Sequence, residues 1–472
     1  MQRTLTASIV LGIAAAIVAA GCKNPTLAAF ERAAAELPAA EAEAKRLGLP
    51  LAGTDLAPAK PIPPDQNANY HLSLAMNAHR QLLEADSNLN AKVVYGIISP
   101  SQQNTPAAAS AVESLSTALD LAVTASKKPD IRFQRDWGST RPWGMMFPER
   151  DALRAVTRSL VLRAQYFAYK GNTSRSIQDF QATMALAKFA GSEPSLLSGL
   201  LQGAIEGSII SGMESALALR PQDEEYWTAL DNIVAEQAES PLDWNHHLGM
   251  EVWSLVASAS VPMQDMRQSL KEMEAEGLAD KDDLNVRTAK RVMQPGVPDP
   301  LLESAYRARA LQIWVEYFRQ DRSQQSVIDA AVDLSTIIHN YSLDDDPTMV
   351  NNQELFDDVV PQGEAFARRE VRLQLFRSLV AVLKYRKANG RFPQSLKDAG
   401  LEPHDPFAGG PVKLLIGDGR VIVYSVGRDR LDDQGVERTE MRVGDDFRRD
   451  VSAIFPRPLR VPPRGQQPDV AT

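Results

Sequence analysis

Cysteine is almost absent from this sequence of 472 residues, which contains only Cys22. A single cysteine cannot form a disulfide within the chain, so core packing must stabilise the fold. Histidine is scarce too, and the six histidines do not follow the spacing of a helical zinc motif. A phosphate-binding glycine loop and the serine motif of the α/β-hydrolases are also missing. The sequence therefore lacks the motifs of the common enzyme classes.

Dense runs of basic residues are missing as well. The chain has 51 lysines and arginines against 60 aspartates and glutamates, which gives a net charge of −9. Because no stretch of Lys and Arg could follow a phosphate backbone, we expect no nucleic-acid partner. Hydrophobic residues make up 44% of the chain, and its length exceeds that of one typical domain, so it has ample material for buried cores.

A long apolar run lies at the N-terminus and ends at the cysteine. Arg3 precedes the apolar residues 5–20, and Gly21-Cys22 follows them. A basic start, a short alanine-rich apolar segment and small residues at its end are typical of a secretory signal. Residues 19–22 resemble the bacterial lipobox, in which the cysteine receives a lipid and becomes the new N-terminus. We expect residues 1–21 to be a signal peptide and Cys22 to anchor the protein to a membrane.

Lys23 bears on which membrane holds the anchor. In proteins with a lipobox, an aspartate directly after the cysteine retains the protein on the inner membrane, and this chain has Lys23 there. The resemblance thus implies a lipoprotein of the outer membrane that faces the periplasm. The alternative is an ordinary cleaved signal with an incidental cysteine.

Helical patterns dominate the next part of the chain. Residues 22–69 are expected to hold the lipidated end, a tether helix over 27–47 and a proline-rich linker. Apolar residues at helical spacing then predict an α-helical domain over 70–362. Within it, residues 163–187 resemble one tetratricopeptide-like helical hairpin. Its turn contains Gly171, and the next residues, Thr173 or Ser174, are expected to cap the second helix.

The pattern changes after residue 362. Residues 364–389 predict a long helix whose apolar face is too wide for a small hairpin to cover, so part of it should dock on the helical domain. β-Branched runs at 412–416 and 421–426 flank an Asp-Gly turn and predict a β-hairpin. The expected fold class is mostly α, with a small α+β module over 363–455 and a disordered tail over 456–472. Four basic residues of the long helix are assigned to its solvent face: Arg368, Arg369, Arg372 and Lys384.

Three short motifs in this module come in a fixed order: Gly390-Arg391-Phe392-Pro393, Asp405-Pro406-Phe407 and Ser425-Val426-Gly427-Arg428-Asp429. Together they resemble the C-terminal globular part of the major pseudopilin of type II secretion. The chain has no prepilin methylation signal, so pilus assembly does not transfer. As a whole, the chain is also similar to bacterial envelope lipoproteins that end in this module, and that similarity brings no known activity.

The pseudopilin resemblance implies a calcium site in the acidic loop after the last predicted strand. Matching the motif makes Asp429 and Asp446 the ligands, with Asp432 as a substitute ligand, and carboxylate oxygens suit calcium. No other cofactor is expected. The alternative is a solvated acidic loop whose carboxylates pair with nearby arginines, namely Arg428, Arg430 and Arg438.

A second candidate site is the loop that carries Trp137, Arg141 and Trp143. Tryptophan and arginine are enriched at binding surfaces, although a loop folded onto the helical core would explain the same residues. The adjacent His246 and His247 point in different directions on a helix. We therefore expect them to be packed or solvent-facing and not to ligate one metal ion.

The expected function is that of a non-enzymatic scaffold or interaction protein with a protein or peptide partner. Helical hairpins bind partners without catalytic groups, which fits the missing motifs. The alternative is a hydrolase whose carboxylates come together in the helical domain, since a glycosidase needs only two such groups. The candidate carboxylates are Glu149, Asp151, Asp179 and Glu206.

Overall fold

The computed structural model describes residues 25–87, 89, 106–139, 145, 147–275, 296–322, 325–341, 348, 359–417, 419–428, 430–432, 434–435 and 450–456. Within these residues the chain is mostly helical and ends in a small antiparallel sheet, so the expected fold class is confirmed. No helix in these ranges is long and apolar enough to cross a membrane. Several residues singled out above lie outside the described ones: the signal peptide with Cys22, and Arg141, Trp143, Asp429 and Asp446.

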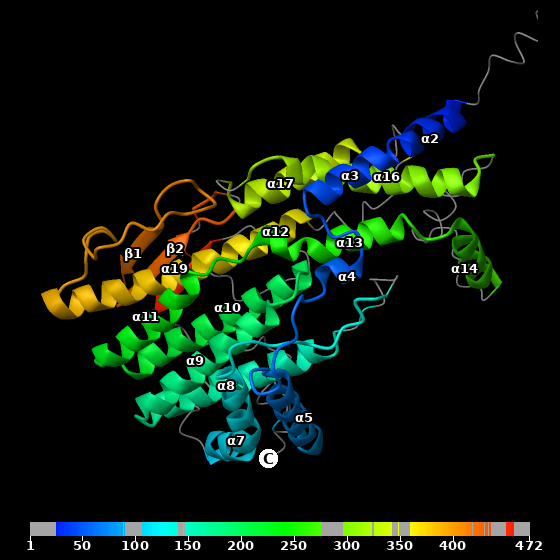
Figure 1. Ribbon diagram of the computed structural model, residues 1–472. Helices are drawn as coiled ribbons and strands as arrows, with labels where there is room; N and C mark the ends of the chain where they lie inside the picture. Colours follow the sequence, from blue (N-terminus) through cyan, green and yellow to red (C-terminus); the bar gives the residue numbers. More distant parts are fainter. Residues whose placement is uncertain are drawn as a thin grey trace, which may run out of the picture.

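The N-terminal segment is part of the folded body. It forms two helices, α2 (Pro25–Ala35) and α3 (Leu37–Arg46), which both pack against α16 (Asp299–Arg319) (Figure 1). The ring of Phe30 meets the ring of Tyr306 edge-on, with 5.5 Å between centroids. The prediction of a single tether helix is therefore wrong, because this segment forms two helices. The second helix starts just before Pro38, which lies in its first turn, where proline is tolerated.

Helical hairpins form the next part of the molecule, as expected. In Figure 1, α8, α9 and α10 run side by side, while α5 and α7 pack beside them. The turn between α8 and α9 uses Gly171 at a φ of 79°, which glycine adopts without steric cost. The cap of α9 is Asn172, whose side chain accepts from Arg175 N, and not Thr173 or Ser174. The helices are α5 (Asn69–Ala85), α7 (Pro106–Ser126), α8 (Glu149–Tyr169), α9 (Thr173–Ala190), α10 (Leu196–Leu219) and α11 (Glu224–Ala238).

A second core forms around α16. It gathers apolar side chains from the N-terminal helices and from the segments between residues 244 and 337, with Trp314 and Tyr317 among its largest buried rings. The other elements of this half are α4 (Gly53–Leu56), α12 (Trp244–His247), α13 (Gly249–Ser258), α14 (Met263–Ala275) and α17 (Val327–Asn340).

The C-terminal module consists of α19 (Val359–Asn389) and a sheet with the strand order β1-β2-β3. The predicted hairpin is present as β1 (Lys413–Gly417) and β2 (Arg420–Ser425). A third strand, β3 (Val451–Phe455), pairs antiparallel with β2 and was not predicted.

The long helix α19 joins the C-terminal module to both cores, which confirms the expected docking. It packs against α10, α11 and α17 as well as against the sheet. Phe366 belongs to the second core. Leu373 belongs to the first core, which is formed by apolar side chains of the helical hairpins, α11, α19 and the sheet, and both side chains are buried. The ring of Phe366 meets Trp244 and His247 edge-on, at 5.2 and 5.4 Å between centroids.

Burial corrects the assignment of the basic residues of α19 to its solvent face. Arg372 is exposed, and Arg368 and Lys384 are half-buried, but Arg369 is buried and pairs with Glu206 of α10. A buried guanidinium without a partner would cost several kcal/mol, so this pair is what permits an arginine at a core position.

Two of the short motifs of the C-terminal module meet around a buried carboxylate. Asp405 Oδ1 accepts hydrogen bonds from Phe407 N and Ser425 Oγ, and Oδ2 accepts from Val426 N at 3.1 Å. The three buried donors need acceptors, and the Asp405 carboxylate supplies them. These contacts hold the two motifs together.

Candidate binding cleft

A cleft of about 370 Å³ lies where four segments of the chain meet. Its volume is within the range of cavities that hold small ligands or short peptide stretches. Its walls are residues 50–58, residues 131–137, residues 192–194 and residues 245–249. The lining residues used below are Pro50, Asp55, Leu56, Pro58, Ile131, Arg132, Phe133, Trp137, Glu193, Pro194, Asn245, His246 and Gly249.

Two glycines let these walls approach each other closely. A Cβ on Gly53 would lie 2.6 Å from the ring of Trp253 and would also overlap the carbonyl oxygen of Trp137. A Cβ on Gly249 would lie 2.9 Å from Leu56 and 3.2 Å from Pro194. Larger residues would push the walls apart, so the shape of the cleft depends on glycine at both positions.

Hydrogen bonds fasten the segment before α10 to α12 and α13. Met250 N donates to Pro194 O at 2.8 Å, and Leu196 N donates to Glu251 Oε1 at 3.2 Å. His247 Nδ1 lies 3.1 Å from Ser195 O. These contacts hold two walls of the cleft in one arrangement before any ligand binds, which lowers the entropic cost of binding.

Arg135 fastens the loop wall from inside. Its guanidinium pairs with Glu149 and with Glu193, whose Oε2 is 2.7 Å from Arg135 Nη2. The rings of Phe133 and Phe147 flank the guanidinium, with centroids 5.3 and 4.4 Å away. Burial raises the pKa of Glu193, while Arg135 opposes that shift. Glu193 therefore serves to hold the wall.

Other polar groups of the cleft have no such partner. Within the described residues, the Asn245 side chain, the Trp137 indole N–H and the His246 ring nitrogens make no hydrogen bond to protein, and Arg132 Nε is buried without an acceptor. The only ion pair of Arg132 in that part of the chain is with Asp130, at 3.7 Å. Arg132 and Trp137 can only donate, so both need an acceptor from a ligand or from solvent.

The structure shows how the loop predicted as a binding surface lies. Trp137 lines the cleft and also packs against Trp253, at 6.3 Å between ring centroids, so this side chain lies on the helical core and lines a cavity at the same time. The histidine pair behaves as expected: His247 is buried and His246 is exposed. Sequence analysis missed Arg132 and Asn245, because nothing in their own neighbourhood indicates that they share a cavity.

The four carboxylates considered for a hydrolase do not come together. Asp151 is exposed, and each of the other three is held by a different arginine: Glu149 by Arg135, Asp179 by Arg163 and Glu206 by Arg369. Acid-base catalysis by two carboxyls requires both of them at one reacting centre.

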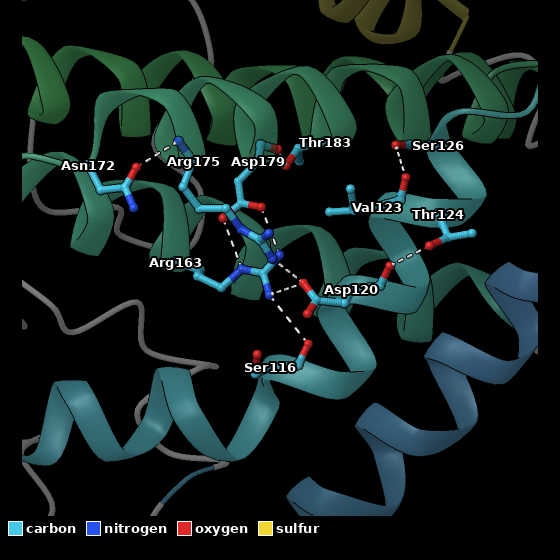
Figure 2. A network of polar contacts seen from close by, with 10 residues as sticks. All are labelled: Ser116, Asp120, Val123, Thr124, Ser126, Arg163, Asn172, Arg175, Asp179 and Thr183. Carbon is cyan, nitrogen blue, oxygen red and sulfur yellow. Dashed lines mark hydrogen bonds and ion pairs between the residues drawn. The ribbon is translucent and has the colours of Figure 1, made fainter.

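Figure 2 shows the second of these pairs in detail. Arg163 points between Asp179 and Asp120, with distances of 2.9 Å from Nε to Asp179 Oδ2 and 2.9 Å from Nη1 to Asp120 Oδ1. Arg175 reaches Asp120 from the other side. Arg163 and Asp179 are both buried, so this pair joins α8 and α9 and is not open to a substrate, while the half-exposed Asp120 links α7 to them.

The third pair links α19 to the helical hairpins. Arg369 Nε lies 2.5 Å from Glu206 Oε2, and Gln202 and Gln237 also donate to the Glu206 carboxylate. Every partner in this group is buried. Such a saturated network fixes how the helices meet.

A serine and a histidine lie side by side in the interior of the helical hairpins. His79 Nε2 is 2.8 Å from Ser159 Oγ, which is hydrogen-bond distance, and burial lowers the pKa of His79 to about 4. Both side chains are 1% exposed. Because a nucleophile must reach its substrate, this arrangement supports the packing of α5 on α8 and not a reaction.

Glu251 is the most perturbed carboxyl near the cleft. Burial raises its pKa to about 8, and its Oε2 is buried without a hydrogen-bond partner among the described residues. Perturbed acids of this kind are common at active sites. However, Glu251 is not one of the residues that line the cleft.

The described part of the acidic loop holds fewer of the expected calcium ligands than the pseudopilin resemblance implies. Asp432 is the one expected calcium ligand in the described part of the chain, where it pairs with Lys413 Nζ at 2.6 Å and accepts from Tyr424 Oη at 3.0 Å. Lys413 lowers the pKa of the Asp432 carboxyl. No group of metal-ligating side chains occurs among the described residues. The pairing of Asp432 is with a lysine, and Arg428 instead pairs with Glu364.

A larger depression, of about 980 Å³, lies at the start of α11. It is a shallow hollow lined mostly by polar residues, and Asp223 uses its side chain to cap the helix there. We therefore regard the cleft at Trp137 as the better candidate. Comparisons with models of known protein families, with curated proteins and with solved structures give no significant match.

Proposed function

We propose that this chain is a lipid-anchored envelope protein that binds a protein or peptide partner in the cleft at Trp137 and catalyses no reaction. The observation that carries the proposal is the contrast between a preformed cleft with unpaired donors and three of the four hydrolase candidates, Glu149, Asp179 and Glu206, each paired with a different arginine. Binding needs only shape, apolar surface and a few polar groups, and the cleft has all three.

Binding is favoured over hydrolysis because of where the carboxylates are. A hydrolase would need two acids at the reacting centre, and the lining carboxylates Glu193 and Asp55 are both engaged. Glu193 is held by Arg135, and Asp55 Oδ2 accepts from Leu51 N and Ala52 N, both at 2.9 Å.

The binding proposal is tested with a display library of random linear peptides, applied to the mature chain with Cys22→Ser. We expect selected peptides to bind the wild-type cleft and to lose about tenfold or more in affinity to Trp137→Ala, since a tryptophan in a pocket often dominates binding energy. Peptides that bind Trp137→Ala equally well, or no selected peptides at all, would overturn the proposal.

The anchor is tested separately. Cys22→Ser should abolish labelling with palmitate and leave an unprocessed or soluble form that no longer partitions into detergent. Wild-type chain should label and fractionate with the outer membrane. A Cys22→Ser variant that stays membrane-bound would contradict the lipoprotein assignment, whatever the peptide experiment shows.

A further inference from the structure

We infer that the partner presents an acidic peptide segment, with a carboxylate next to an apolar side chain. This inference rests on the proposed binding function and names the chemistry that the cleft would recognise.

Two of the unpaired groups of the cleft can only donate hydrogen bonds. Arg132 has five N–H groups and accepts nothing, and Trp137 has only its indole N–H to offer. Within the described residues, Arg132 Nε is buried without an acceptor and its guanidinium meets one carboxylate, Asp130, at 3.7 Å. That distance lies beyond a hydrogen bond, and both side chains are partly exposed. A ligand carboxylate would supply the missing acceptor.

The lining carboxylates do not call for a basic ligand. Arg135 compensates Glu193 at 2.7 Å, and the backbone N–H groups of Leu51 and Ala52 satisfy Asp55 Oδ2. Arg132 is the cation that lines the cleft without a close partner in the described residues. The buried donor that the lining leaves without an acceptor therefore belongs to a cation, Arg132, which an anionic group of a ligand would suit.

The walls indicate what should stand beside the carboxylate. Leu56, Ile131 and Phe133 form apolar surface, and three prolines extend it: Pro50, Pro58 and Pro194. At the rim, the Asn245 amide and the His246 ring can hydrogen-bond the backbone of an extended chain. The cleft thus combines an apolar floor, a backbone-binding rim and one cation, which fits a short acidic peptide.

Peptides selected on wild-type chain supply the test. We expect them to carry Asp, Glu or a free C-terminal carboxylate beside an apolar residue, and to bind Arg132→Glu about tenfold or more weakly. Arg132→Lys, which keeps the charge but loses the planar fork, should cost about threefold. The matched control is Lys397→Glu, because it makes the same charge change at an exposed side chain of the C-terminal module.

The ligand provides a second control. Replacing the acidic residue of a selected peptide by its amide should weaken binding to wild type as much as Arg132→Glu does, and the two changes together should cost little more than either alone. Neutral or basic peptides that need Trp137 but ignore Arg132→Glu would overturn this inference and leave the binding function standing. An absence of any selected peptide would overturn both.

Discussion

The buried arginines of the helical body and the polar groups of the cleft differ in where their hydrogen bonds go. Arg163 and Arg369 are buried and donate hydrogen bonds to Asp179 and Glu206 respectively. Arg132 in the cleft keeps a buried Nε without an acceptor in the described residues. The satisfied pairs fix how helices pack, whereas a buried donor that lines a cleft is free to bind an acceptor from a ligand or from solvent, as the proposed function requires of Arg132.

The largest effect should come from a charge placed in the joint between the two cores. Phe366→Asp and Leu373→Asp each put a carboxylate at a side chain that is 1% exposed, so either should lower the free energy of unfolding by several kcal/mol. Denaturant unfolding measures this, and Leu431→Asp at a 64% exposed position is the matched control. Unaltered unfolding would contradict the docking of α19, as would two independently stable fragments after proteolysis near Gln362.

Breaking one interior pair should have the next largest effect. Glu206→Ala leaves Arg369 buried without its counter-charge, which should cost about 3 to 5 kcal/mol of stability. Replacing both residues by apolar ones of similar size should recover most of that loss, because no charge then remains buried. If the double variant were as unstable as the single one, the pair would not be the unit that we describe.

The stability of the fold should also depend on pH in two opposite ways. His79 and His247 have pKa values lowered to about 4 by burial, so only the unfolded chain takes up their protons, and stability falls as the pH drops from about 6.5 to 4. Glu251 has its pKa raised to about 8, so stability also falls as the pH rises from about 4.5 to 8.

The variant Glu251→Gln separates the effect of Glu251 on stability from that of the two histidines. The neutral amide removes the second effect, so the variant should be a few kcal/mol more stable than wild type at about pH 8.5 and close to it at about pH 5. Urea unfolding at both pH values measures the difference. If the variant and the wild type differed in stability by the same amount at both pH values, Glu251 would not titrate between them.

Calcium should have the smallest effect. Asp432 is already paired with Lys413 and Tyr424, as the interior carboxylates are paired with arginine. We therefore expect millimolar calcium to raise the melting temperature of the full chain by no more than about 2 °C over a chelator control. A clearly larger rise that Asp432→Asn removes would instead support the calcium site implied by the pseudopilin resemblance.

Local patterns predicted the elements, and long-range contacts escaped prediction. The hairpin of α8 and α9 and the β1–β2 turn follow from periodicity and glycine placement. The five residues of β3 have no turn signal linking them to β2, so the third strand was missed. Arg369 looked like a surface residue because its partner, Glu206, is 163 positions away in sequence.

The cleft could be anticipated only in part. Trp137 was singled out by its residue type, and its loop was expected either to bind or to pack. Arg132 and Asn245 gave no signal, because the cleft walls come from four segments between residues 50 and 249 that meet only in the folded chain. Contacts of this kind depend on tertiary packing, which a single sequence does not reveal.

The most direct test of the contrast between the structural pairs of the helical body and the binding groups of the cleft is the double variant Asn245→Ala and His246→Ala. Both side chains are exposed and make no hydrogen bond to protein in the described residues, so the free energy of unfolding should stay within about 0.5 kcal/mol of wild type. Affinity for a peptide selected on the wild-type chain, measured by titration, should fall about tenfold or more. Unchanged affinity, or a loss of stability like that of Glu206→Ala, would contradict the account.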